Sequence, residues 1–315
     1  MPEEARKVLV VGASGFLGRH LSRALLSAGR QVRCSARNPV RIGDLAVAGC
    51  ETVRADISDS ASIGRALDSV DAVYICIHTL SPQPMNTDRR GFMEVEKQGL
   101  KNIVEAARIR GTRRLIYVTS LGIGPDAKSA WLRERWEADQ FLLGSELEVT
   151  ILQSGQMIGV GAQGFDLLVR QARRRVAIGL GGGDRQQRAI DIGDLTYFLL
   201  GVLDDPRTHG RTYDVGSDDL LTNDQMLDVI AESLGRRHPA KLHIPSAIVA
   251  PFAPLADRLA KLPPGSVKGL LSSLEADMTG DTGPIRELLP RVPLTYREAV
   301  RKALVHSVDG DQRGV

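Results

Sequence analysis

The chain has 315 residues, of which 43% are hydrophobic and 25% are charged, a balance typical of a globular protein with a substantial core. The net charge is only +3, the arginines are scattered and aromatic residues make up 4%. The composition therefore lacks the clustered basic and aromatic residues that are typical of nucleic-acid-binding proteins. The three cysteines lack metal-site spacing, and there is neither an apolar leader nor a stretch that could span a bilayer, so we expect a cytoplasmic protein with no metal and no membrane partner.

The first predicted element is a strand of four aliphatic residues, Val8 to Val11, which we expect to be buried on both faces. Gly12, Gly15 and Gly18 follow at intervals of three residues, and apolar residues then recur at helical spacing. Such a turn suits a dinucleotide, because glycines permit the tight turn and close approach of a pyrophosphate, and free N–H groups at the helix start meet its charge. The alternative is a purely structural turn.

A second strand, Gln31 to Ala36, ends at Arg37 and Asn38. In a unit of this type the strand end meets the adenosine ribose, where a carboxylate binds the 2′-hydroxyl of NAD and an arginine favours the 2′-phosphate of NADP. Because Arg37 and no carboxylate ends this strand, we expect NADP(H) to be preferred, with NAD(H) possible and Arg33 in a supporting role. The alternative is that Arg37 is a surface arginine without a ligand.

The third strand, 51–55, leads to Asp56 and Ile57. Asp56 could accept a hydrogen bond from the adenine amino group while Ile57 covers the ring, or Asp56 could cap a short helix at 60–68. The fourth strand, 72–77, is almost entirely apolar and therefore central, and it ends at His78. A proline-containing loop, 79–91, follows at the edge of the sheet where ligands bind in such folds.

A helix is predicted at 92–110, with Gly99 allowing close packing, then a strand at 115–119 that ends at Ser120. A helix at 129–143 and a strand at 149–152, closed by Gln153, complete the regular alternation. This alternation predicts an α/β fold with a doubly wound parallel sheet. We therefore assign residues 1–160 to a dinucleotide-binding domain.

Beyond residue 160 the pattern changes to helical segments and breaks. Segments near 186–216 are expected to return to the main sheet, and the rest of 161–315 to form a smaller, mainly helical lid that binds substrate. Thr222 with Gln225, and Thr295 with Glu298, have the spacing of capping boxes that open helices.

Several motifs in this chain resemble the atypical, extended short-chain dehydrogenase/reductases, with the NmrA-like NAD(P)-binding branch as the nearest. They are GASGFLG at 12–18, ADIS at 55–58, VTSLG at 118–122, AIDIGDL at 189–195 and YDVGSDDLLT at 213–222. The resemblance implies a Rossmann sheet of about seven strands with a small C-terminal substrate domain.

The resemblance also implies a set of cofactor contacts. The glycine turn would hold the pyrophosphate, Arg37 the 2′-phosphate, Asp56 with Ile57 the adenine, and the segment from Cys76 to His78 the nicotinamide ribose. The implied cofactor-binding residues are Gly12, Ser14, Gly15, Phe16, Leu17, Gly18, Arg37, Asn38, Asp56, Ile57, Cys76, Ile77, Thr119 and Gln153.

Catalytic residues carry over less directly. The superfamily uses a tyrosine and, four residues later, a lysine that lowers the tyrosine pKa. Here Trp131 stands at the tyrosine position and Arg135 at the lysine position, which leaves Ser120 and His78 as catalytic candidates. Ser120 could instead cap the strand end, and His78 could be held by backbone contacts. Arg135 could bind a carboxylate substrate or lie on the helix surface.

These features favour an NAD(P)H-dependent reductase, acting as a monomer or homodimer on a small, largely apolar carbonyl or enone substrate. A non-catalytic NADP(H)-binding redox sensor or assembly protein is the alternative from another class, because an indole is no acid–base catalyst near neutral pH. A non-redox lyase or cyclase on the same fold is a third reading, since function lies in the site and not in the fold.

Overall fold

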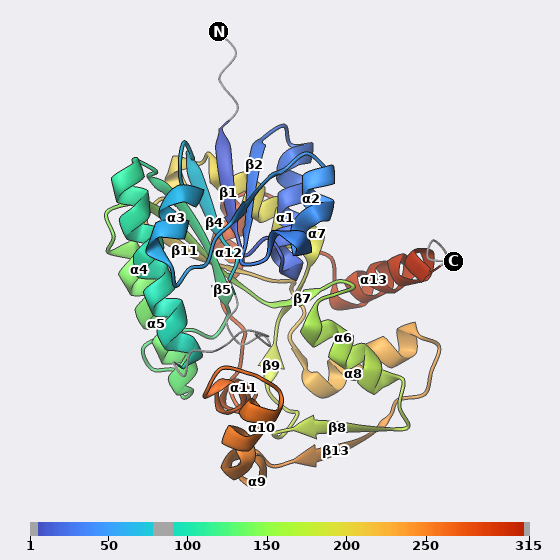
Figure 1. The fold of residues 1–315 in the computed structure, drawn as a ribbon. Coiled ribbons are helices and arrows are strands. Elements are labelled where there is room, and N and C mark those ends of the chain that lie inside the picture. Colours follow the sequence, from blue (N-terminus) through green and yellow to red (C-terminus); the bar gives the residue numbers. More distant parts are fainter. Residues whose placement is uncertain (1–5, 78–90, 312–315) are drawn as a thin grey trace.

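The computed structural model describes residues 6–77 and 91–311, with side chains up to residue 305. Its centre is a seven-stranded parallel sheet in the order β11-β6-β5-β4-β1-β2-β3, with helices on both faces (Figure 1). This is the doubly wound Rossmann sheet that the sequence predicts. The strands are β1 Lys7–Val11, β2 Gln31–Ala36, β3 Glu51–Arg54, β4 Ala72–Ile75, β5 Arg114–Ser120, β6 Glu148–Ser154 and β11 Arg211–Val215.

Alternate residues of each central strand enter two separate hydrophobic cores, one on each face of the sheet. Val8 and Val10 of β1 face the core beneath α1 and α7, whereas Leu9 and Val11 face the core beneath α3, α4 and α5. Because both faces are covered, the central strands are nearly continuous apolar runs. The covering helices are α1 Phe16–Ser27, α7 Ile192–Leu203, α3 Ser60–Ala66, α4 Phe92–Arg110 and α5 Ala130–Leu143.

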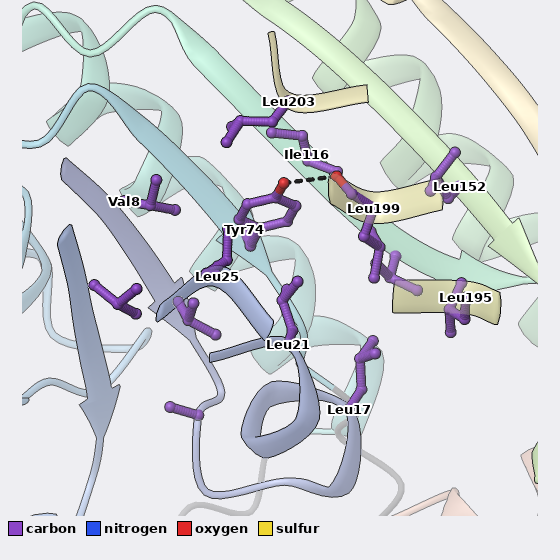
Figure 2. Packing of buried hydrophobic residues seen from close by; sticks show 14 of the residues in the cluster. Val8, Leu17, Leu21, Leu25, Tyr74, Ile116, Leu152, Leu195, Leu199 and Leu203 are labelled. Carbon is purple, nitrogen blue, oxygen red and sulfur yellow. Dashed lines mark hydrogen bonds between the residues drawn. The ribbon is translucent and has the colours of Figure 1, made fainter. Parts of the chain in front are cut away.

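Figure 2 shows the core in which leucines of α1 and α7 pack around Tyr74 of β4. The Tyr74 hydroxyl donates a hydrogen bond to the Leu199 carbonyl at 2.7 Å, so this buried polar group is satisfied. Each buried leucine contributes about 1.5–3 kcal/mol relative to exposure, so these residues hold α1 firmly against the sheet. They recur at intervals of four: Leu17, Leu21 and Leu25 in α1, and Leu195, Leu199 and Leu203 in α7.

The C-terminal half adds a third core and several short elements around it. β8 Val176–Leu180 pairs in parallel with β13 Ala240–Ile244, while β7 Gln156–Ile158 pairs with β10 Ala189–Asp191 and β9 Gln186–Gln187 with β12 Leu221–Thr222. The remaining helices are η1 Pro39–Ile42, α2 Gly43–Val47, α6 Gln163–Ala172, η2 Pro206–Thr208, α8 Asn223–Ser233, α9 Ser246–Val249, η3 Ala250–Phe252, α10 Ala253–Leu259, α11 Ser266–Ser273, α12 Gly283–Leu288 and α13 Tyr296–Asp311. None of the described helices is long and apolar enough to cross a bilayer.

Both predicted capping boxes are present. Gln225 N donates to Thr222 Oγ1 at 3.2 Å, and Thr222 N donates to Gln225 Oε1 at 2.8 Å. Glu298 N donates to Thr295 Oγ1 at 3.3 Å, and Thr295 N donates to Glu298 Oε2 at 2.9 Å. Each box satisfies N–H groups that have no partner within the first turn of the helix.

Strand limits differ from the predictions where pairing decides them. β4 ends at Ile75 instead of residue 77, because its neighbour β1 pairs with it only up to Val11 and then turns away at Gly12. β6 extends to Ser154 instead of residue 152, because its residues pair with β5 as far as Ser120. The β8–β13 pair was not expected, although Ala240, Leu242 and Ile244 of β13 alternate with Lys241 and His243.

Candidate cofactor site

The glycine turn lies at the carboxyl ends of β1 and β4, the point where the strand order of the sheet reverses. Gly12 has a φ of +88°, and a Cβ there would lie 2.4 Å from the Cys76 carbonyl oxygen. A Cβ on Gly18 would lie 2.3 Å from the Gly12 carbonyl oxygen. These two glycines are therefore required by backbone conformation and by the packing of α1 against the turn.

Gly15 differs from both, because its backbone conformation allows a side chain and a shift of a few tenths of an ångström would make room for a Cβ. Its φ is −80°, it is exposed, and the nearest atom to an added Cβ is the Gly12 carbonyl oxygen at 3.3 Å. No side chain of the described residues caps α1, which begins directly after Gly15. The N–H groups of the first turn are thus left for an anion or water, and a Cβ on Gly15 would enter the same space.

The next residues contribute backbone more than side chain. The Phe16 ring lies against His20, with ring centroids 4.7 Å apart, and a Cβ on Gly159 would lie 2.6 Å from its Cζ. Leu17 is buried in the core beneath α1. Because these side chains are committed to packing, an anion would meet the backbone of this turn, beside the half-buried Ser14.

At the adenosine end, the structure separates the arginines by role. Arg37 is exposed directly after β2, and the Asn38 carboxamide accepts a hydrogen bond from Val40 N at the start of η1. Arg33 is buried, donates to the Ala66 and Asp68 carbonyls at 2.9 and 2.7 Å, and forms an ion pair with Glu51. The prediction that Arg33 assists Arg37 is wrong, because the Arg33 side chain is buried and its two terminal nitrogens are bonded within the protein.

Arg54 was missed by the sequence reasoning. It is the exposed last residue of β3, and its Cα pairs with that of Ala36, the residue before Arg37. Two arginines therefore leave this edge of the sheet from neighbouring strands. The signal in the sequence was the basic residue at the end of the third strand, which is informative only once the pairing of β2 with β3 is known.

Asp56 and Ile57 follow β3 as predicted, but the cap of α3 is another residue. Asp59 accepts from the first-turn N–H groups of α3, whereas Asp56 Oδ1 accepts from Ser58 N at 2.9 Å and Ser58 Oγ at 2.8 Å. The capping role proposed for Asp56 is therefore wrong. Ile57 packs against Gly99 of α4, where an added Cβ would lie 2.6 Å from its Cδ1, so the predicted close approach at Gly99 involves this residue.

Cys76 and Ile77 follow β4 at the centre of the edge. Burial raises the pKa of the Cys76 thiol to about 12, which keeps it protonated and unreactive. The catalytic candidate His78 and nearly all of the predicted loop 79–91 lie outside the described residues.

The region expected to carry catalysis contains a buried ionic cluster, which we call the α5 cluster: Glu96, Tyr117, Arg135 and Asp139. Arg135 is 1% exposed, and its Nη2 lies 3.3 Å from Glu96 Oε2. Tyr117 donates its hydroxyl hydrogen to Glu96 Oε1 at 2.8 Å. Both roles considered for Arg135 are therefore wrong, because it neither lies on the helix surface nor has its charge available for a substrate carboxylate.

The α5 cluster reaches the ends of β5 and β6. Arg135 Nη1 donates to Thr119 Oγ1 at 2.8 Å, and its guanidinium carbon lies 5.1 Å from the centre of the Trp131 ring. Gln153 donates to Asp139 Oδ2 at 3.0 Å. Burial raises the pKa of Asp139 to about 7, while Gln153 and Arg135 act in the opposite direction. Burial, the largest single influence, lowers the pKa of Arg135, but Glu96, Tyr117 and Asp139 together raise it above its ordinary value, so the cation persists.

Besides Arg135 Nε, two buried donors in this region have no hydrogen-bond partner among the residues that the structure describes: Ser120 Oγ and Trp131 Nε1. They come from the end of β5 and the first turn of α5, the positions expected for the catalytic serine and tyrosine. A buried donor without a partner costs about 1–3 kcal/mol, so such groups are typical of functional sites.

Sequence reasoning also missed Glu96 and Asp139. Both have helical spacing from residues that were noticed: Glu96 lies three residues before Gly99, and Asp139 lies four after Arg135. A carboxylate on the buried face of one predicted helix, with an arginine on the buried face of another, is a pattern that indicates an internal ion pair.

A pocket of about 560 Å³ lies between the residues before α5 and the C-terminal half. Its lining includes Lys128, Ser129, Arg185, His243 and Ser246, so several polar and charged side chains reach it. Within the described part of the chain, no group of three or more His, Cys, Asp or Glu side chains is arranged to hold a metal ion.

Comparison with known proteins agrees with this geometry. A family model described as NAD(P)H-binding matches residues 12–206. Among curated relatives, sterol demethylase protein B of Methylococcus capsulatus is 31% identical over 51% of this chain and 49% of its own length. The photosystem II assembly factor Ycf39 of Cyanophora paradoxa is 29% identical over 46% and 44%. The chain thus spans about half the length of these two relatives.

A third relative matches over nearly its full length. The (4-alkanoyl-5-oxo-2,5-dihydrofuran-3-yl)methyl phosphate reductase of Streptomyces griseus is 26% identical over 92% of this chain and 95% of its own. Among solved structures, an NADPH-dependent quinone oxidoreductase from Escherichia coli shares the fold, with a TM-score of 0.69, 20% identity and coverage of 94% and 99%. The chain belongs to the NAD(P)H-binding family, within the atypical short-chain dehydrogenase/reductase superfamily that its motifs resemble.

Proposed function

We propose that this protein is an NADPH-dependent reductase of a small carbonyl or enone compound. The observation that carries the proposal is the β1–α1 turn, in which Gly12 and Gly18 are needed for packing, whereas packing does not require Gly15, at the exposed start of α1 where a diphosphate would bind. Bound there, the nicotinamide cofactor supplies the hydride. The Streptomyces griseus relative, whose name describes a reductase of an unsaturated furanone, supports this reaction class.

Arg37 and Arg54 support a preference for NADP(H) over NAD(H). Both are exposed at the edge where the adenosine ribose is expected, and an arginine pairs well with a 2′-phosphate. The substitution Arg37→Asp should lower the ratio of NADP to NAD affinity by about tenfold or more, since it replaces an attraction by a repulsion. Arg174→Asp, an exposed arginine of the C-terminal half, is the matched control.

Ser120 and Trp131 are the proposed substrate contacts. Each offers a buried donor without a partner in the described structure, and a carbonyl oxygen is the acceptor that such donors would polarise. Neither group need transfer a proton, which can come from water or from the undescribed His78. Arg135 is proposed as a positioning residue that does not touch the substrate. It donates a hydrogen bond to the Thr119 hydroxyl and makes a cation–π contact with the Trp131 ring. The segment 161–315 would supply the lid over this substrate, and the pocket before α5, which neither Ser120 nor Trp131 lines, is not the proposed substrate site.

The test is NADPH oxidation, followed by absorbance, with a panel of enones, quinones and ketones. Ser120→Ala and Trp131→Phe each remove one donor and keep the packing, so kcat/KM should fall about 10²-fold. Ser233→Ala is the control, because the Ser233 hydroxyl is bonded to the Val229 carbonyl in the remote α8. Turnover that neither substitution changes would refute the proposed contacts.

The second candidate function is a non-catalytic NADP(H)-binding sensor or assembly protein. It is favoured by Trp131 at the tyrosine position and by the assembly factor among the relatives. Tight NADPH binding without oxidation across the whole panel would favour it over the reductase.

A further inference from the structure

One surface of the C-terminal half is apolar and basic at the same time. It is formed by residues 246–270, which comprise α9, η3, α10 and most of α11, and we call it the α9–α11 surface. Its exposed apolar side chains are Ile248, Phe252, Leu255, Leu259 and Leu270, with relative exposures of 60, 63, 57, 76 and 46%.

Four of these side chains recur at the spacing of a helical face. Ile248, Phe252, Leu255 and Leu259 are separated by four, three and four residues along 246–259, where α9, the 3-10 turn η3 and α10 follow one another without a loop between them. The opposite face turns inward, where Ala253 is buried. Single exposed apolar residues are ordinary on a protein surface, but a row of four on one face is not.

The charges on the α9–α11 surface are of one sign. Arg258, Lys261 and Lys268 are exposed. Asp257 is the only acidic residue in this segment and is 5% exposed, because its carboxylate accepts hydrogen bonds from Gly265 N and Val267 N at 2.9 and 2.8 Å. The solvent-facing charge of 246–270 is therefore entirely positive.

The position of this surface suits a flat partner. α9, α10 and α11 lie together at the end of the molecule opposite the start of β1, so contact there leaves the Rossmann sheet clear (Figure 1). α9 also forms part of the pocket described above, through Ser246 and Ala247. An apolar helical row flanked by basic residues, at one end of a molecule, is the arrangement that binds the interface of an anionic bilayer.

We propose that the α9–α11 surface docks this protein on anionic lipid membranes as a peripheral protein. The apolar row enters the boundary between headgroups and acyl chains, and the three basic side chains meet lipid phosphates and carboxylates. This goes beyond the expectation of no membrane partner, which considered only segments that span a bilayer. The proposal is independent of the reductase function, because it requires neither cofactor nor turnover.

The test is flotation of the full-length protein, without nucleotide, with vesicles of phosphatidylcholine alone or mixed with phosphatidylserine. We expect binding to the mixed vesicles that is about tenfold stronger than to the neutral ones and that weakens in high salt. Absence of binding to the mixed vesicles at low salt, or equal binding to both kinds, would overturn the proposal.

Two variant sets separate the apolar and basic contributions. Phe252→Ser with Leu255→Ser and Leu259→Ser should abolish flotation. Val47→Ser with Ile109→Ser and Val292→Ser, apolar positions elsewhere that are as a set more exposed, should not. Arg258→Glu with Lys268→Glu should weaken binding by about tenfold or more, and Arg173→Glu with Arg174→Glu, which change the charge equally, should not.

Sedimentation velocity of the same variants tests whether a second copy of the chain covers this surface instead of a membrane. A wild-type dimer that becomes a monomer in the Phe252, Leu255 and Leu259 variant would show that a second copy covers this surface, and would contradict the membrane proposal. Native near-ultraviolet circular dichroism of each variant excludes unfolding as the cause of lost flotation.

Discussion

Arg135 illustrates how a substitution at a catalytic position can become structural. The lysine of the superfamily dyad faces a tyrosine, but Arg135 is enclosed with Glu96 and neutralises it in a region that excludes water. A charge left alone in such a place is expensive, whereas the intact pair costs little relative to an apolar replacement.

The substitution Arg135→Met should therefore lower the free energy of unfolding by about 3–5 kcal/mol, because Glu96 loses its cation. The double variant Glu96→Gln with Arg135→Met should recover most of that loss, since the amide oxygen still accepts from Tyr117. Urea unfolding of both variants measures the difference. A single variant as stable as the wild type would show that the pair is not formed.

Asp139 makes stability depend on pH. Its ordinary pKa of 3.8 is raised to about 7 by burial, so between these values the folded protein keeps a proton that the unfolded chain has released. The contribution of this group to stability thus falls as pH rises through that window and is constant above it. Within that window, the free energy of unfolding of Asp139→Asn should therefore rise relative to that of the wild type, by up to about 1.4 kcal/mol for each pH unit.

Urea unfolding at pH 5, 6, 7 and 8, compared between wild type and Asp139→Asn, isolates this effect because other titrating groups cancel in the difference. A difference that does not change with pH over about pH 5 to 7 would mean that Asp139 is ionised throughout the window.

At the scale of elements, the junction of β1 and α1 depends on the absence of one side chain. Gly18→Ala would place a methyl group 2.3 Å from the Gly12 carbonyl oxygen, so helix and turn must separate. We expect a loss of about 1–3 kcal/mol in thermal or urea unfolding. Gly64→Ala, in α3, meets nothing closer than the end of the Arg110 side chain and should be neutral or stabilising. Equal stability of the two variants would contradict the packing argument.

Much of this element structure could be predicted from local signals. The limits of β2 and α4 are those that the sequence predicts, and the capping box at Thr222 is present. What could not be predicted depends on partners distant in the chain: the early end of β4, the β8–β13 pair, and the Glu96–Arg135 ion pair between α4 and α5. The sequence analysis named only Asp56 as a cap for this helix, but the backbone places Asp59, directly before Ser60, in that position.

At the scale of the whole molecule, the Rossmann sheet depends on segments after residue 160. β11 forms the edge beside β6, and α7 covers one face of the sheet. Arg114 of β5 ties them together by donating to the Leu203 carbonyl at 3.0 Å and to Thr208 Oγ1 at 3.0 Å. The N-terminal half is thus incomplete without α7.

A fragment of residues 1–160 should therefore fail to fold cooperatively, because it leaves the face that α7 covers exposed to water. We expect the fragment to bind the dye ANS and to lack a near-ultraviolet circular dichroism signal. The full chain should not bind ANS and should show that signal. A fragment with a sharp unfolding transition of its own would show that 161–315 is dispensable for the sheet.

Calorimetric titration with NADPH tests the central claim most directly, namely that the backbone turn between β1 and α1 binds the diphosphate of a nicotinamide dinucleotide. The wild type should release or absorb heat and melt at a higher temperature with NADPH. Gly15→Ala, which needs only a small shift of the Gly12 carbonyl, should bind at least about tenfold more weakly with little change in melting temperature without ligand, whereas Gly64→Ala should bind normally. Absence of heat and of a melting shift with NADP(H) and NAD(H) alike, or undiminished binding by Gly15→Ala, would contradict the account.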